Sequence, residues 1–88
     1  MVKIFKYDLG IDGVCTIING RFKQILDIQI QNGEPKAWIL LDDDCDKKSW
    51  AITAIGTGWE MDLIPGKYVG TVQDNCGYVW HYFLEELK

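Results

Sequence analysis

The sequence predicts a small all-β domain, mainly antiparallel, built as a sandwich or a barrel-like sheet of six or seven strands. Turn signals recur at regular intervals, near residues 10–13, 19–20, 32–35, 42–48, 56–58, 64–66 and 74–77. The runs between them are short and rich in β-branched and aromatic residues, which is typical of strands. Because 88 residues are too few for two independent cores, we expect residues 1–88 to form one domain.

Taken in order, the runs predict strands at residues 2–9, 14–19, 23–31, 36–42, 49–55, 67–73 and 78–84. Alternation is clearest in the third run, where Leu26, Ile28 and Ile30 are expected to face one side of the sheet. The fourth run is apolar on both faces from Ala37 to Leu41, which indicates a central strand or one covered by a second sheet or subunit.

The turns between the strands carry two specific expectations. Asn19-Gly20 predicts a two-residue hairpin that pairs Ile18 with Arg21. The stretch 32–35 predicts a longer turn, with Pro35 placed ahead of the next ladder. Helix is supported only at residues 83–88, where strong helix formers predict a short C-terminal helical turn, with fraying as the alternative.

Charge and composition narrow the classes of partner. The net charge is −4, with 9 Lys and Arg against 13 Asp and Glu, which argues against duplex nucleic acid as a partner. No apolar run approaches the roughly 20 residues that span a bilayer, and no signal sequence is evident, so we expect a cytoplasmic protein without a membrane partner. A chain this short has a thin core, so burial against a second copy would count heavily and a homo-oligomer is expected.

Catalytic and metal-binding groups are sparse, so we predict that the protein is not an enzyme and needs no cofactor or metal. His81 is the single histidine, and its place in an alternating strand favours a structural or binding-site role over that of a general base. Cys15, Cys45 and Cys76 lack the close spacing of zinc loops and are expected to be reduced thiols.

The acidic stretch 42–46 resembles the opening of a calcium loop. The match fails because Lys47 and Thr53 stand where the loop requires glycine and glutamate. A solvated acidic loop is therefore the favoured interpretation.

The aromatic residues and a glycine-rich turn suggest a ligand site. Gly56-Thr57-Gly58 fits either a tight turn or an anion site. Large rings can stack nucleobases or form a protein interface, although cross-strand packing in the core is the alternative. If a nucleotide stacks on these rings, Lys67 or Arg21 is expected to bind its phosphate. The predicted ligand-binding set is Trp38, Gly56, Thr57, Gly58, Trp59, Tyr68, Trp80 and His81.

The order of motifs resembles a family of small phage-encoded proteins of largely unassigned function. The resemblance covers nearly the whole chain, but this sequence has Arg21-Phe22-Lys23-Gln24 where a proline, glycine and alanine are expected, and Trp59 in place of a histidine. The matching pieces are Lys6-Tyr7-Asp8-Leu9, Ile25-Leu26, Gln31-Asn32-Gly33-Glu34-Pro35, Ala37-Trp38-Ile39-Leu40-Leu41-Asp42, Gly56-Thr57-Gly58, Tyr68-Val69-Gly70-Thr71-Val72-Gln73 and Val79-Trp80-His81-Tyr82-Phe83.

The resemblance implies a phage accessory protein that acts in the cytoplasm of the host cell. Such proteins often counter host defence, either by sequestering a cyclic nucleotide or by contacting a host protein. The expected function is therefore non-enzymatic sequestration of a small nucleotide-type ligand. The alternative is an inhibitor of a host factor, or a minor structural protein of the virion.

Overall fold

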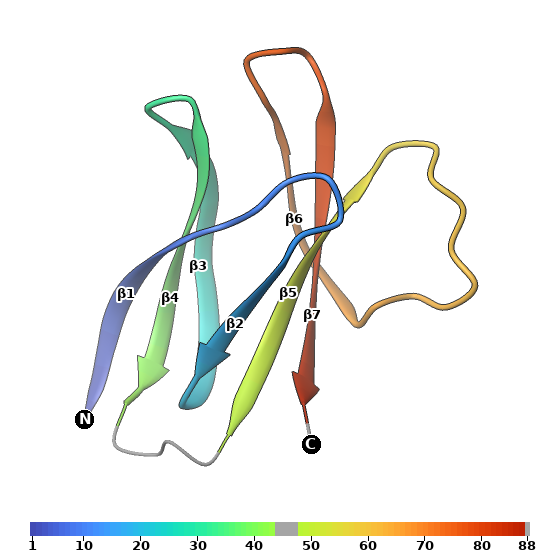
Figure 1. Cartoon of the computed structure of the whole chain (residues 1–88). Coiled ribbons are helices and arrows are strands. Elements are labelled where there is room, and N and C mark those ends of the chain that lie inside the picture. Colours follow the sequence, from blue (N-terminus) through green and yellow to red (C-terminus); the bar gives the residue numbers. More distant parts are fainter. Residues whose placement is uncertain (44–47, 88) are drawn as a thin grey trace.

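A computed structural model describes residues 1–43 and 48–87, and Figure 1 shows the course of the chain. These residues form seven strands and no helix, which confirms the predicted all-β class. Among them there is accordingly no helix that could cross a membrane. All of the strand pairings are antiparallel. The strands are β1 (Val2–Asp8), β2 (Cys15–Asn19), β3 (Arg21–Gln31), β4 (Glu34–Asp42), β5 (Ser49–Gly56), β6 (Lys67–Gln73) and β7 (Val79–Leu87).

The strands form two sheets that pack against each other as a sandwich. One sheet has three strands in the order β1-β4-β3, and the other has four in the order β2-β5-β7-β6. The chain therefore changes sheet after β1, after β2 and after β4 (Figure 1). β4 lies between β1 and β3, which confirms the prediction of a central strand at 36–42.

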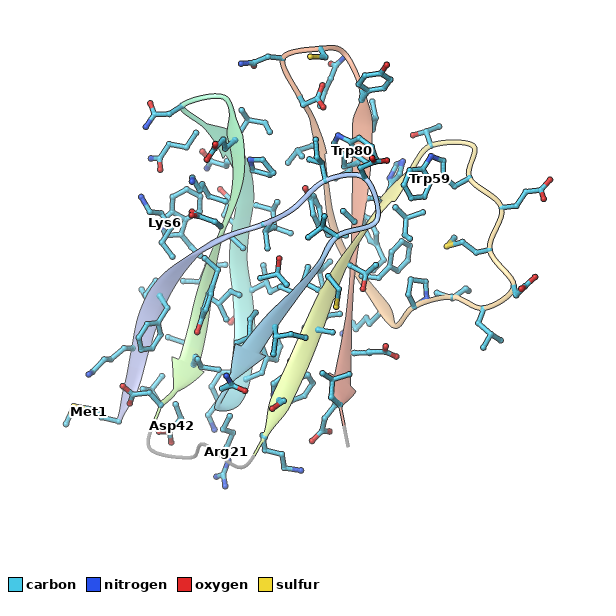
Figure 2. The ribbon with its side chains drawn as sticks, in the orientation of Figure 1. Met1, Lys6, Arg21, Asp42, Trp59 and Trp80 are labelled. Carbon is cyan, nitrogen blue, oxygen red and sulfur yellow. The ribbon has the colours of Figure 1, made fainter. Side chains whose placement is uncertain are left out.

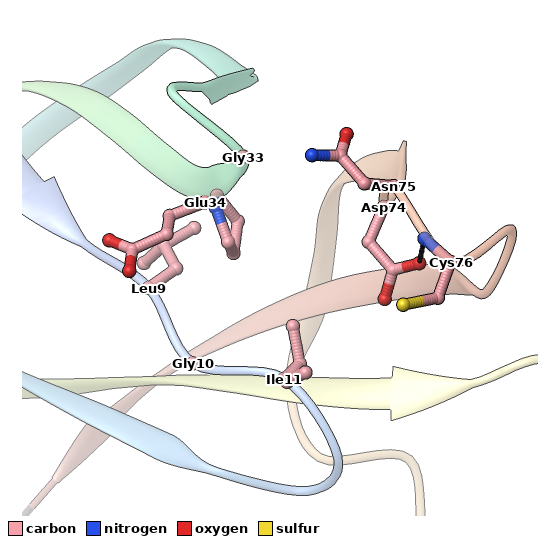
Figure 3. Close-up of a pocket in the computed structure, with 9 residues that line it drawn as sticks. Leu9, Gly10, Ile11, Gly33, Glu34, Asp74, Asn75 and Cys76 are labelled. Carbon is pink, nitrogen blue, oxygen red and sulfur yellow. Dashed lines mark hydrogen bonds between the residues drawn. The ribbon is translucent and has the colours of Figure 1, made fainter.

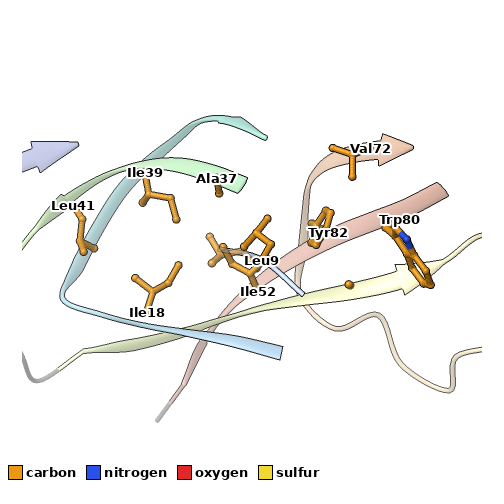
Figure 4. Close-up of a cluster of buried hydrophobic side chains, with 11 residues drawn as sticks. Leu9, Ile18, Ala37, Ile39, Leu41, Ile52, Val72, Trp80 and Tyr82 are labelled. Atoms are coloured by element: carbon orange, nitrogen blue, oxygen red, sulfur yellow. The ribbon is translucent and has the colours of Figure 1, made fainter. Parts of the chain in front are cut away.

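The core forms where alternate side chains of both sheets meet, as expected when each sheet has one buried face. Because β4 is central, three of its side chains reach the core from the three-stranded sheet, while β5 and β7 contribute most from the other. The core cluster consists of Leu9, Ile18, Ala37, Ile39, Leu41, Ile52, Ala54, Val72, Trp80, Tyr82 and Leu84 (Figure 4).

β3 departs from simple alternation at Leu26. The register passes from Ile25 opposite Ile39 to Asp27 opposite Trp38, so Leu26 is an extra residue in a β-bulge. Its side chain is 44% exposed, whereas Ile25 packs against the core. The prediction that Leu26 shares a face with Ile28 is therefore wrong. One inserted residue switches the side chains that follow it to the opposite faces of the sheet from those that strict alternation predicts.

Asn19-Gly20 does not form a hairpin. β2 pairs with β5 and β3 pairs with β4, so Ile18 and Arg21 belong to different sheets and the predicted pair is wrong. Gly20 has a φ of 128°, and a Cβ there would lie 2.9 Å from the carbonyl oxygen of Asp42. The glycine is needed for this close approach, at the point where the chain crosses from one sheet to the other.

The two-residue hairpin lies instead at Asn32-Gly33. Both residues have positive φ values, 54° and 82°, as the primed hairpin turns of type I′ require. Gln31 consequently pairs with Glu34, and the longer turn predicted at 32–35 is corrected. Pro35 lies inside β4 opposite Ile30 rather than ahead of the ladder.

The C-terminal residues continue β7 and do not form the predicted helical turn. Ser49 pairs with Leu87 and Trp50 pairs with Glu86, so the ladder with β5 runs to the end of the described chain. Pairing with β5 satisfies the backbone groups of these residues, and this tertiary pairing overrides their helix propensity.

Tyr82 joins β7 to the connection between β1 and β2. Its buried hydroxyl donates a hydrogen bond of 2.8 Å to the carbonyl oxygen of Gly10. Burial, with a smaller contribution from the charge of Asp74, raises the pKa of Tyr82 from 10.0 to about 12. Because the folded-state pKa is raised, the associated stability is complete below pH 10 and is lost as the pH rises through 12.

We expect Tyr82→Phe to lower the free energy of unfolding at neutral pH by about 1 kcal/mol, since a hydrogen bond is lost. The variant should also lose less stability than the parent between pH 10 and pH 12, because it lacks the titrating hydroxyl. Urea denaturation across that range measures both effects. An identical pH dependence in the two proteins would contradict this role of Tyr82.

Candidate functional site

Six of the eight predicted ligand-binding residues line one hollow on the outer face of the four-stranded sheet. We call it the His81 hollow; it has a volume of about 240 Å³. It lies where the end of β5, the 57–66 connection, β6 and β7 meet, and the connection extends from the strands beside it (Figure 1). Its lining is Ile55, Gly56, Thr57, Gly58, Trp59, Met61, Tyr68, His81 and Phe83.

A row of hydrogen-bonded side chains runs along the hollow. The Nε2 atom of His81 lies 2.7 Å from Thr57 Oγ1, and its Nδ1 atom lies 3.1 Å from Thr71 Oγ1. The Tyr68 hydroxyl lies 2.7 Å from the same Thr71 oxygen. Since a hydroxyl can donate or accept, the row accommodates either tautomer of the imidazole and fixes the orientation of the ring.

The sheet register explains how the row forms. Thr71 on β6 and Ile55 on β5 both lie directly opposite His81 on β7. Directly opposite side chains on one face of a sheet are within contact distance, so the imidazole has a neighbour on each side. Thr71 and Ile55 are absent from the predicted set, because only the pairing of the strands reveals them.

Aromatic side chains form the walls of the hollow. The rings of Tyr68 and Phe83 lie 5.9 Å apart in an edge-to-face arrangement. The indole of Trp59 packs over Gly56 on the side of Trp80, which lies opposite Gly56, and a Cβ at Gly56 would come within 2.5 Å of the indole Nε1 atom. Gly56 therefore leaves the space that Trp59 occupies. Alternation along β7 puts Phe83 on the same face as His81, whereas no local signal marks Met61.

Two predicted residues, Trp38 and Trp80, lie elsewhere. Trp38 is on the outer face of the other sheet, opposite Lys6 and Asp27. Trp80 points into the core and is only 6% exposed, and its ring centroid lies 5.7 Å from that of Trp59 (Figure 2). The indole of Trp80 thus supports Trp59 from behind rather than lining the His81 hollow.

The expected phosphate-binding groups do not gather at the hollow. Lys67 lines a separate hollow between β3 and β6, and neither Lys67 nor Arg21 lines the His81 hollow. Backbone groups near the Gly-Thr-Gly turn are already used, because the N–H of Thr57 donates to Val79 and that of Trp59 to Gly56. The described lining carries hydroxyls, an imidazole and rings, and suits an uncharged group better than a phosphate.

The remaining candidates are dispersed. Cys15 and Cys76 are exposed free thiols on different elements, and Cys45 lies outside the described residues. Residues 44–46 of the predicted acidic loop and Lys47 also lie outside them, whereas Asp42 and Thr53, which were compared with the same calcium loop, lie in β4 and β5. Within residues 1–43 and 48–87, no three histidine, cysteine, aspartate or glutamate side chains are grouped as a metal site would need.

Comparison with known proteins identifies a family for the whole chain. No curated protein sequence and no solved structure matches it. One family model, described as a domain of unknown function, matches residues 1–88. The chain therefore belongs to the DUF7352 family.

Proposed function

We propose that the protein is a non-enzymatic binding protein that sequesters a small nucleotide-type ligand, with the base of the ligand in the His81 hollow. The observation that supports this most strongly is the hydrogen-bonded row of Thr57, His81, Thr71 and Tyr68 between aromatic walls. Base edges present both donors and acceptors, and hydroxyls can match either. Stacking on an aromatic side chain contributes about 1–3 kcal/mol per base.

The size of the hollow limits the ligand. Its volume of about 240 Å³ lies below the range of roughly 300–1,000 Å³ that is usual for drug-sized ligands. A single base fits this space, and the sugar and phosphate would extend into solvent. This placement agrees with a lining that, among residues 1–43 and 48–87, includes no lysine or arginine.

Binding without catalysis is favoured by the surroundings of His81. A general base needs a ring nitrogen directed at its substrate. Here both nitrogens lie within hydrogen-bond distance of threonine hydroxyls, so the imidazole is better placed to orient a ligand than to take its proton. For the biological setting we propose a phage accessory protein in the host cytoplasm that counters host defence, on the strength of the family resemblance alone.

Native mass spectrometry of the protein with a panel of bacterial cyclic nucleotides tests the proposal. We expect one nucleotide to be retained at a fixed number per protein, and Thr71→Val to weaken its affinity about five- to tenfold, because one hydrogen bond and the positioning of His81 are lost. Thr16→Val, the same change on β2, is the control and should bind like the parent. Failure to retain any nucleotide would overturn the proposal.

A second candidate function is binding to a host protein, or to a further copy of this chain. It is favoured by the 57–66 connection, which exposes Met61, Leu63 and Ile64, with Leu63 84% exposed. Exposed apolar groups beside a hollow are common at protein interfaces. Leu63→Asp should then abolish capture of a host protein, or dissociate an oligomer seen by native mass spectrometry, while nucleotide retention is unchanged.

A further inference from the structure

A second hollow lies on the other side of Trp59, at the end of the sandwich. It has a volume of about 410 Å³, and its lining includes the aromatic residues Trp59, Tyr78 and Trp80 and the acidic residues Asp12 and Asp74. We propose that this hollow, which we call the aromatic cage, binds an organic cation that carries a methylated ammonium group. It is separate from the His81 hollow, with which it shares only Trp59.

The three rings are close enough to act on one group. The ring centroid of Trp80 lies 5.7 Å from that of Trp59 and 6.1 Å from that of Tyr78. Tyr78 is 65% exposed, so a ligand can reach the cage from solvent. A cation within about 6 Å of an aromatic face is attracted by the electrons of the ring, and several rings around one cation add their attractions.

Asp74 supplies a fixed negative charge in the cage. Its Oδ2 atom accepts a hydrogen bond of 2.9 Å from the indole of Trp80, and its Oδ1 atom accepts from the backbone N–H groups of Cys76 and Tyr78 at 2.9 and 3.0 Å. The hydrogen bond from Trp80 comes first among the causes that hold the pKa of Asp74 below its ordinary value of 3.8. The carboxylate is therefore ionised at neutral pH and is held in place against the ring of Trp80.

Asp12 faces the cage from the connection between β1 and β2. This residue has a φ of 58°, and the N–H of Val14 closes the turn around it by donating to Ile11 at 3.1 Å. Figure 3 shows Ile11 and Asp74 among the residues that line a neighbouring hollow, which shares Ile11, Asp74 and Cys76 with the cage. Among the described residues that line the cage there is no lysine or arginine, so its two carboxylates give it a net negative charge.

These features distinguish the possible classes of ligand. A phosphate would be repelled by two carboxylates, and a metal ion would need several oxygen ligands, whereas three of the lining residues are aromatic. A methylated ammonium group carries a charge but is weakly hydrated, and so it gains most from rings backed by carboxylates. The group could belong to a small metabolite or to a methylated lysine side chain, since the two present the same chemistry.

Titration with choline and with its neutral isostere 3,3-dimethyl-1-butanol tests the charge requirement. The two molecules have nearly the same shape and differ in the charge of the central atom. We expect choline to shift the indole N–H signals of Trp59 and Trp80 in NMR spectra with saturation, and the isostere to bind at least about fivefold more weakly. Equal affinities, or no saturable shift with choline, would overturn the proposal.

The same titration with trimethyl-lysine amide identifies the source of the group. Tighter binding of this amide supports a protein side chain, and tighter binding of choline supports a small metabolite. Either result agrees with a site for methylated ammonium.

Two variants localise the site. Asp12→Asn removes a negative charge and keeps a residue that tolerates a positive φ. Tyr78→Leu removes an exposed aromatic ring. We expect each variant to weaken choline binding about three- to tenfold. Asp62→Asn, an equal change of charge outside the cage, is the control and should have no effect. Equal losses from Asp12→Asn and Asp62→Asn would contradict the site. Thr71→Val changes a residue beside the His81 hollow and should leave choline binding intact. Choline binding therefore tests the aromatic cage independently of whether the protein binds a nucleotide.

Discussion

Ile39→Ala is expected to lower the free energy of unfolding by about 3–4 kcal/mol, because it empties space at the centre of the core. Ile39 is 0% exposed and lies on the central strand β4, between Phe5 on β1 and Ile25 on β3 (Figure 4). A domain of this length is stabilised by about 5–10 kcal/mol in total. The substitution should therefore remove a large part of the stability, seen as a lower midpoint in urea denaturation.

Ile4→Ala is the matched control for this experiment. It deletes the same atoms from the adjacent strand β1, but Ile4 is 60% exposed on the outer face of the same sheet. We expect a loss below about 1 kcal/mol at this position, as for most surface substitutions. Similar losses at both positions would contradict the assignment of the core to the inner face of β4.

Gly66→Ala is expected to destabilise the protein by about 2–5 kcal/mol, through unfavourable backbone geometry and a steric clash. Gly66 has a φ of 112°, and a Cβ there would lie 2.2 Å from the carbonyl oxygen of Leu84 and 2.6 Å from its carbonyl carbon. The start of β6 would have to move away from β7. Because Tyr68 pairs with Phe83 just beyond this point, the aromatic wall of the His81 hollow should be displaced as well.

Gly77→Ala separates the clash from the effect of φ alone. Gly77 also has a positive φ, 90°, but a Cβ there would have no atom within 4 Å. The expected loss is about 1–2 kcal/mol, the ordinary penalty for a left-handed residue with a side chain. Thermal unfolding of the two variants makes the comparison. If Gly66→Ala costs no more than Gly77→Ala, the close approach of Gly66 to β7 does not constrain the fold.

The positions of the strands follow from local patterns, whereas their pairing does not. Asn19-Gly20 and Asn32-Gly33 carry the same two residues, so local preference alone cannot tell which of them forms the two-residue hairpin. The sequence predicts this hairpin at Asn19-Gly20. The structure uses the second, because β2 finds its partner in β5, beyond the β3–β4 hairpin. The bulge at Leu26 is hidden for the same reason, since only the partner strand shows which residue is extra.

The residues of the candidate site also fall into two groups, those that a local pattern indicates and those that only the pairing of strands reveals. Thr57 and His81 could be selected from a glycine-rich turn and an alternating strand. Thr71 could not, because its role depends on lying opposite His81 across a ladder. The large ring of Trp80 makes it a candidate for stacking, but alternation cannot say which face of a strand is buried, and the structure places the face of Trp80 in the core.

The order of the strands also bears on how the protein assembles during synthesis. The β3–β4 hairpin closes through a two-residue turn, so it can form as soon as it leaves the ribosome, at little entropic cost. β2 emerges earlier but has to wait for β5. The His81 hollow draws on β5, β6 and β7, so its lining is incomplete until β7 has been synthesised.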